Sequence, residues 1–245
     1  KWLLLSWING DKISSPNKQH CKLLINFLQE IQLYRKSHDA KNISNASEAC
    51  FHLEEHINHV KFRVDFLLKN LMQSSKFNIK IPHKIVFFIE DLYKQLIAIE
   101  EKEIIKIDKK MVVEKVLSPS DVGFHNILVD GNKMNFIDFE YAGWDDPNKL
   151  ICDLILQPDS NIPIKYINVL NELIKGEILP DDFLIRIPIM LRLYRIKWII
   201  IILNPFLKKN VCLTEIEIET IFQRALYYSN ESNSRISKST YKLLN

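Results

Sequence analysis

Three side chains whose oxygen atoms suit metal or proton chemistry lie in one short stretch, SPSDVGFHNILVDGNKMNFIDFE, which covers residues 118–140. They are Asp121, Asn126 and Asp138. Magnesium takes oxygen ligands, commonly one or two from the protein, so the Asn126 amide and the Asp138 carboxylate suit it. Asp121 is then free to accept a proton from an attacking hydroxyl group. Each residue also has a plainer interpretation, in which it caps a turn or satisfies loop backbone.

The segment between Asn126 and Asp138 has the pattern of a β-hairpin. Two β-rich halves flank Asp130-Gly131-Asn132, and Gly and Asn tolerate the positive φ that tight hairpin turns require. Pairing of the two halves brings Asn126 and Asp138 close together at the open end of the hairpin. The predicted site therefore depends on this hairpin.

Helical patterns dominate the rest of the chain, so the predicted fold class is α+β, mainly α-helical. Apolar residues recur at helical spacing over about 18–35 and 83–107. Asn45 followed by Glu48 predicts a capping-box start for a long helix that reaches Leu71. Further segments follow: helices near 147–157, 163–175, 181–204 and 213–229, and a partly loose polar tail over 230–245.

Composition narrows the class of protein. The 245 residues carry a formal charge of +3, a balance that does not indicate a nucleic-acid partner. No apolar run approaches the length that a membrane span needs, so no membrane partner is expected. The four cysteines are far apart and form no C-x-x-C pair, which predicts reduced thiols and a cytoplasmic location. Nothing in the composition indicates an oligomeric state.

A second candidate metal site lies in HLEEH, residues 52–56. His52, Glu55 and His56 fit the H-x-x-E-H pattern of a zinc peptidase helix, in which both imidazoles lie on one face. The alternative is an exposed polar helix face. Zinc peptidase chemistry is therefore a remote second hypothesis.

The first stretch resembles a known family. SDVGFHN followed by FIDFEYAGWDDP is similar to the catalytic and metal-binding segments of the aminoglycoside phosphotransferase and choline kinase family, relatives of protein kinases. The resemblance implies a catalytic loop at 118–126 with Asp121 as the base. It also implies a metal segment at 137–140, with Asn126 and Asp138 as Mg²⁺ ligands and ATP as the phosphate donor.

The resemblance extends upstream. LLLSWINGDKI resembles the family's hinge, which implies a hinge strand and connector over 1–12 that binds adenine through the Ser6 carbonyl and the Ile8 amide. A plain core strand is the alternative. Residues 13–229 then form the C-terminal lobe. We expect the N-terminal small lobe to be largely absent from this chain, which would be a fragment of a longer enzyme that folds but phosphorylates poorly alone.

Two departures from the family pattern concern the catalytic loop. Pro119 stands where the family has a histidine, and Leu150 stands where it often has an acidic residue, for which Asp146 or Asp153 are candidate replacements.

Two functions stay open. One is a small-molecule kinase that transfers the γ-phosphate of ATP to a substrate hydroxyl, with choline-like amines, aminoglycosides and sugars all possible. The other is a catalytically inactive kinase-like binding domain.

Overall fold

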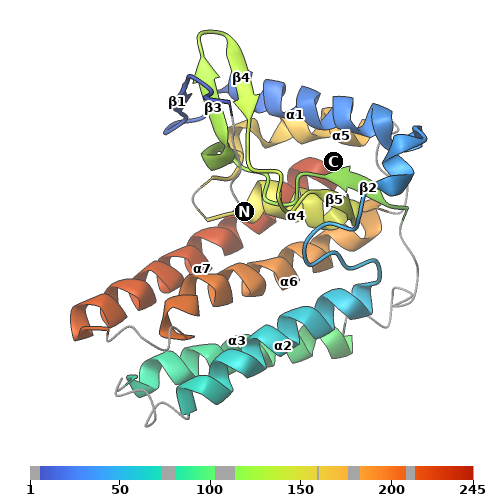
Figure 1. Ribbon diagram of the computed structural model, residues 1–245. Helices are drawn as coiled ribbons and strands as arrows, with labels where there is room; N and C mark the ends of the chain where they lie inside the picture. Colours follow the sequence, from blue (N-terminus) through green and yellow to red (C-terminus); the bar gives the residue numbers. More distant parts are fainter. Residues whose placement is uncertain are drawn as a thin grey trace. The chain divides into compact units, whose positions relative to one another are not determined.

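The described part of the chain is mainly helical, as predicted, and contains two small sheets, of which the sequence predicted only a hairpin (Figure 1). The computed structural model describes residues 6–72, 81–102, 114–158, 160–175, 183–207 and 213–244. It divides into two compact units. Unit 1 comprises residues 1–49 and 115–180, and unit 2 comprises residues 50–114 and 181–245.

Unit 1 contains the helix α1 (Lys18–Leu33), which begins with a capping box. The side chain of Asn17 accepts from the His20 backbone, and the His20 ring accepts from the Asn17 backbone, so two otherwise unpaired N–H groups are satisfied. One face of α1 is buried, and it packs against α5 (Leu170–Lys175) and β2 (Val116–Ser118). The described residues of this unit also form α4 (Pro147–Leu156) and the short 3₁₀ segments η1 (Tyr34–Lys36), η2 (Asp39–Asn42), η5 (Phe124–Asn126) and η6 (Ile164–Val169).

The predicted hairpin is confirmed. Strands β3 (Ile127–Asp130) and β4 (Lys133–Phe136) pair antiparallel, with Asp130 opposite Lys133. The turn uses Gly131 at φ +58°, a conformation that costs glycine little. Strand β1 (Asp11–Lys12) adds to β3, and β2 pairs with β5 (Gly143–Asp145) in a separate sheet.

Unit 2 is built from the helices α2 (Leu53–Met72), α3 (His83–Lys102), α6 (Phe183–Leu203) and α7 (Glu215–Leu244), with η7 (Asn204–Leu207) after α6. Helix α6 is apolar around most of its circumference and contacts the other three helices (Figure 1), as expected of a central core helix. Its buried Arg195 donates to the Ser229 carbonyl and hydroxyl and to Gln95 Oε1. Burial lowers the pKa of Arg195, and these hydrogen bonds offset the cost of burying the guanidinium.

Two predicted helix boundaries are wrong. Helix α2 begins at Leu53 rather than at Asn45, because Glu55 Oε2 accepts the Phe51 and His52 backbone N–H groups at 2.6 and 3.2 Å. Helix α7 continues beyond 229 to Leu244. Its polar half keeps a narrow buried stripe, formed by Ser232, Ile236, Ser239 and Leu243.

Residues 6–10 form no strand, and the rest of the predicted hinge strand lies outside the described residues, as do 103–107 of the third predicted helix. The segment predicted as a helix at 163–175 divides into η6 and α5.

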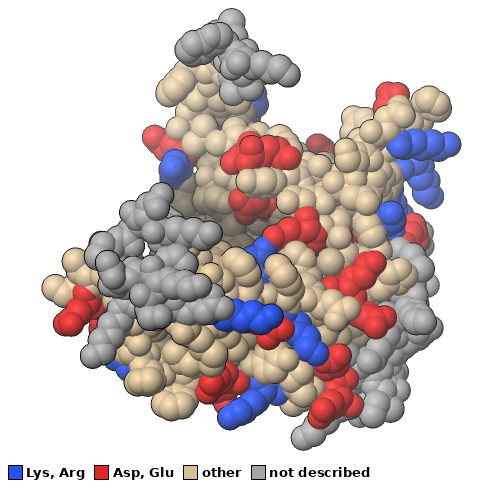
Figure 2. All heavy atoms as spheres, turned by 60° about the horizontal axis from the view of Figure 1, so that its bottom comes forward, with Lys and Arg blue, Asp and Glu red and all other residues tan. Residues whose placement is uncertain are grey.

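On the face in Figure 2, Lys and Arg side chains lie among Asp and Glu side chains. Within the described residues, no helix combines the length and apolar character needed to cross a membrane.

Candidate active site

The loop that carries Asp121 leaves β2 and is fixed at its start. The side chain of Gln32 on α1 donates to the Leu117 carbonyl at 2.6 Å and accepts from the Leu117 N–H at 3.0 Å. After the strand, the Ser120 N–H donates to Ser118 Oγ at 2.9 Å and the Asp121 N–H donates to the Pro119 carbonyl at 2.9 Å. This second pair of bonds forms a tight turn directly before Asp121.

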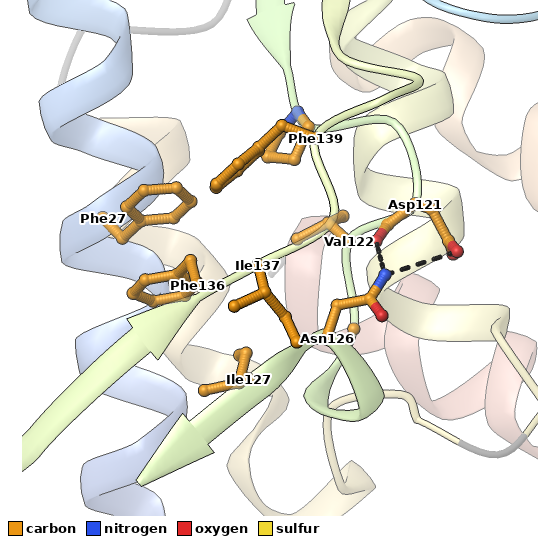
Figure 3. A pocket seen from close by; sticks show the side chains of 10 residues that line it. Phe27, Asp121, Val122, Asn126, Ile127, Phe136, Ile137 and Phe139 are labelled. Carbon is orange, nitrogen blue, oxygen red and sulfur yellow. Dashed lines mark hydrogen bonds between the residues drawn. The ribbon is translucent and has the colours of Figure 1, made fainter. Parts of the chain in front are cut away.

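Both carboxylate oxygens of Asp121 are hydrogen-bonded. Gln157 Nε2 donates to Oδ1 at 2.9 Å, and His125 Nε2 lies 3.3 Å from Oδ2. Asn126 Nδ2 donates to the Asp121 carbonyl at 3.0 Å and to Oδ2 at 3.4 Å (Figure 3). The bond from His125 lowers the pKa of Asp121 more than partial burial raises it. The carboxylate is therefore ionised and oriented at neutral pH.

The hairpin places Asn126 next to the segment that holds Asp138. The Ile137 N–H donates to the Asn126 carbonyl at 3.0 Å, so the ladder of β3 and β4 continues one pair beyond the strands. Asn126 thus lies opposite Ile137, the residue before Asp138. Because the Asn126 amide nitrogen faces Asp121, its Oδ1 points away from that carboxylate (Figure 3).

The donor set of Asn126 and Asp138 fits Mg²⁺. Asp138 is exposed, and its carboxylate makes no hydrogen bond or ion pair with any described residue. Its backbone has φ +65°, a strained conformation that costs roughly 1–3 kcal/mol and is concentrated at functional sites. One amide and one carboxylate oxygen match the few protein ligands that Mg²⁺ takes when phosphates complete its shell. No group of three or more His, Cys, Asp or Glu in the described residues could hold a metal.

A pocket opens beside Asp121 and Asn126. Its apolar wall includes the rings of Phe27 and Phe136, stacked at 3.7 Å between centroids, and Phe139, 6.1 Å from Phe27. The lining comprises Phe27, Pro119, Asp121, Val122, Gly123, Asn126, Ile127, Phe136, Ile137 and Phe139 (Figure 3). The pocket is a small hollow in which an apolar wall meets the polar side chains of Asp121 and Asn126.

The structure brings together some of the predicted residues and separates others. Asp121 and Asn126 are in direct contact and line the pocket. The pocket is lined by Ile137 and Phe139, the neighbours of Asp138, and not by Asp138 itself. Ser6 and Ile8 are exposed, lie in no helix or strand and do not line this pocket.

Sequence reasoning missed the residues that support the loop from α4 and the segment after it. Ser160 Oγ accepts the His125 N–H at 2.6 Å, and the Ser160 carbonyl accepts the Phe124 N–H at 3.4 Å. Gln157 caps the end of α4 and reaches Asp121. The available signal was the spacing of Lys149, Asp153 and Gln157 four residues apart, which places polar groups on one face of a predicted helix.

Lys149 is the centre of a buried cluster beneath the loop. Its Nζ lies 2.5 Å from Asp145 Oδ2, 3.7 Å from Asp153 Oδ2 and 3.2 Å from Ser120 Oγ. Burial alone would lower the pKa of Lys149, but the two carboxylates outweigh burial and raise it. Asp153 therefore belongs to the cluster, whereas Asp146 caps α4 by accepting the Asn148 N–H at 2.7 Å.

The zinc hypothesis at residues 52–56 is wrong. His56 is buried, and its Nδ1 lies 3.0 Å from the Tyr194 hydroxyl. The Glu55 carboxylate accepts the two backbone N–H groups before α2. His52 lies directly before the first residue of α2, and its carbonyl accepts the His56 N–H at 3.2 Å. The three residues serve helix capping and core packing.

Comparisons with known proteins support the kinase resemblance at the level of fold. No family model matches the chain, and no curated protein matches its sequence. Its structure is similar to a choline kinase from Cryptosporidium parvum, with 14% identity, a TM-score of 0.52 and coverage of 98% of this chain and 74% of that one. The chain shares the choline and ethanolamine kinase fold.

Two further solved structures show the same kinase fold. A Plasmodium vivax ethanolamine kinase has 13% identity and a TM-score of 0.54, and the match covers 96% of this chain and 68% of that one. A choline/ethanolamine kinase family protein from Mesorhizobium loti has 17% identity and a TM-score of 0.52, with coverage of 96% and 73%. The predicted protein-kinase-like architecture is thereby confirmed.

Proposed function

We propose that the protein is an ATP-dependent phosphotransferase that transfers the γ-phosphate to a hydroxyl group of a small molecule. The observation that carries the proposal is the Asp121 carboxylate, held by Gln157, His125 and Asn126 at the edge of an apolar pocket. This arrangement lies within a kinase fold. An oriented, ionised carboxylate beside a candidate phosphate site is what transfer to a hydroxyl requires.

In the proposed reaction, the acceptor hydroxyl oxygen bonds to the γ-phosphorus and the bond from that phosphorus to the bridging oxygen of ADP breaks. Asp121 accepts the hydroxyl proton. Asn126 and Asp138 would hold Mg²⁺, which supplies neutralisation of the triphosphate charge. The Ser6 carbonyl and Ile8 amide would contact the adenine, as the hinge resemblance implies.

The surface beside the loop favours a cationic acceptor. Phe139, Glu140 and Tyr141 are exposed, and the hydrogen bond to Glu140 raises the pKa of Tyr141. A carboxylate and aromatic rings together attract an ammonium group. Amino alcohols are therefore the first acceptors to test, in line with the choline and ethanolamine kinases of similar structure.

The test is an ATP-consumption assay with Mg²⁺ over amino alcohols, aminoglycosides and sugars, using the complete natural protein that contains this sequence. We expect ADP release that depends on both the acceptor and Mg²⁺. Phosphorylated acceptor, identified by mass spectrometry, separates transfer from simple ATP hydrolysis. Nucleotide binding without turnover on any acceptor would instead support the kinase-like binding domain.

A further inference from the structure

One face of α4 carries polar side chains that meet the catalytic loop. Lys149, Asp153 and Gln157 are four residues apart, so they lie along a single stripe of the helix. All three are buried, although charged and amide side chains normally stay in water. Buried charged and amide groups require polar partners. The loop supplies two of these partners, Ser120 for Lys149 and Asp121 for Gln157.

The C-terminal end of the stripe contacts the catalytic carboxylate itself. Gln157 Nε2 donates to Asp121 Oδ1 at 2.9 Å, while the Gln157 backbone N–H donates to the Asp153 carbonyl at 3.0 Å. The side chain therefore extends from an ordered helix end. Gly123 passes so close that a Cβ there would collide with Gln157 Oε1. The amide is thus enclosed between helix and loop.

The N-terminal end of the stripe contacts the residue before Asp121. Lys149 Nζ lies 3.2 Å from Ser120 Oγ and is held from below by Asp145 and Asp153. Ser120 has φ +65°, a conformation that serine adopts only under restraint from its surroundings. The contact with Lys149 is one such restraint.

We propose that Lys149 and Gln157 are positioning residues that fix the catalytic loop at Ser120 and Asp121. Pro119 offers no side-chain hydrogen bond of its own, and α4 supplies an anchor at Ser120 and another at Asp121, in addition to those from Gln32 and Ser160 elsewhere in the loop. This inference rests on the proposed phosphotransferase function, in which Asp121 must meet the acceptor hydroxyl. Removing either anchor allows the Asp121 carboxylate to move. The substituted residue itself contacts neither the nucleotide nor the acceptor in this proposal.

The test uses Gln157→Met and Ser120→Ala. The first removes the donor to Asp121 at similar volume. The second removes the loop's bond to Lys149, and with it the 3.5 Å bond from Ser120 Oγ to the Ser47 carbonyl, while the buried ion pairs stay intact. Lys149→Met is avoided because it leaves Asp145 and Asp153 buried without their counter-ion. The matched control is Gln29→Met, which removes a Gln side-chain bond to the Glu172 carbonyl in the same unit.

We expect kcat to fall about ten- to a hundredfold in each test variant, since small misplacements of a reacting group have effects of this size. The KM for ATP should change by less than about twofold, because binding before the transfer step is retained. Amide hydrogen exchange should rise severalfold across residues 119–126 only. Gln29→Met should leave all three quantities unchanged.

Two results would overturn the proposal. One is unchanged exchange across residues 119–126 in both variants. The other is an equal loss of melting temperature, kcat and ATP affinity, which would indicate a structural role alone. If the unaltered protein phosphorylates no acceptor, the proposed function fails, but local exchange still decides whether Lys149 and Gln157 position the loop.

Discussion

Asp121 is held as a carboxylate by its neighbours rather than tuned to be a strong base. The hydrogen bond from His125 outweighs partial burial and lowers the pKa of Asp121, with Asn126 and Lys149 acting in the same direction. A carboxyl group with a low pKa removes protons poorly before a reaction begins. In the proposed phosphoryl transfer, Asp121 would therefore orient the hydroxyl group and accept its proton late in the reaction.

Asp121→Asn and Asp138→Ala should separate transfer from metal binding. Asp121→Asn removes the proposed proton acceptor, so kcat should fall on the order of 10²- to 10⁴-fold while ATP affinity is retained. Asp138→Ala removes a proposed metal ligand, so it should abolish turnover and weaken the Mg²⁺-dependent part of ATP binding. Steady-state kinetics and calorimetry of ATP binding measure both. Equal loss of ATP affinity in the two variants would contradict the assigned roles.

His125→Ala should raise the pKa of Asp121, because it removes the largest cause that lowers it. In the unaltered protein the pKa lies below the ordinary value of 3.8. The associated stabilisation is complete above pH 3.8 and is lost as pH falls through the lower, folded-state pKa. A ¹³C NMR titration of the Asp121 carboxyl carbon measures the change. Identical midpoints with and without His125 would show that this bond does not set the pKa.

The sequence could predict where some candidate site residues lie, because their positions follow local rules. The hairpin signal brought Asn126 toward Asp138, and the resemblance assigned Asp121. For Gln157 the only signal in the sequence was its spacing of four residues from Asp153, which places it on one helix face but does not show that it contacts Asp121. Its role arises from packing of α4 against a loop distant in sequence.

Among elements, the hairpin was predicted correctly and the start of α2 was not. The difference is whether local residues or distant contacts decide the backbone conformation. The hairpin turn depends on Gly131 and its immediate neighbours. At Asn45 and Glu48, by contrast, the helix start that the capping-box pattern favours competes with contacts to residues distant in sequence. Asn45 forms a β-bridge with Trp144, and Glu48 adopts φ +55°, which is not helical. Tertiary pairing overrides a weak local preference.

Gly143→Ala should destabilise the protein more than Gly131→Ala, although both add one methyl group. A Cβ at Gly143 would collide with the Ser44 carbonyl oxygen and lie 2.6 Å from Ala46 N, so backbone must move. At Gly131 the space is open, and only φ +58° opposes alanine. We expect about 1–3 kcal/mol for overpacking at Gly143 and about 1 kcal/mol at Gly131.

Urea unfolding measures both glycine variants, with Gly131→Asn as the control for the turn, since Asn tolerates positive φ. Gly143 lies in β5, which pairs with β2, the strand that leads into the loop of Asp121. Gly143→Ala should therefore also reduce kcat. A larger stability loss in Gly131→Ala would show that the close approach at Gly143 is readily relieved.

At the scale of the whole molecule, the candidate site and the helical core around α6 belong to different units. Asp121, Asn126, Asp138 and the α4 stripe all lie in unit 1, whereas α6 organises unit 2. Each unit is assembled from two separate stretches of the sequence. Local patterns predict helices but not which distant segments pack together, so the sequence indicated the fold class and not this division.

Mg²⁺ and ATP together should raise the melting temperature of the protein more than either alone. A ligand at one hundred times its Kd stabilises the folded state by about 2.7 kcal/mol, and each kcal/mol shifts the melting temperature of a chain of this size by roughly 2–4 °C. Differential scanning calorimetry with ATP and Mg²⁺, with ATP and EDTA, and with Mg²⁺ alone measures the three cases.

The same calorimetry on variants locates the stabilising site. Asp138→Ala should respond equally to ATP with and without Mg²⁺, whereas Asp121→Asn should keep the full Mg²⁺-dependent increase, since it leaves both proposed ligands in place. The increase should appear in the transition of unit 1 where the two units unfold separately, because linkage stabilises the part that binds. A Mg²⁺-dependent increase that survives Asp138→Ala would place the metal elsewhere.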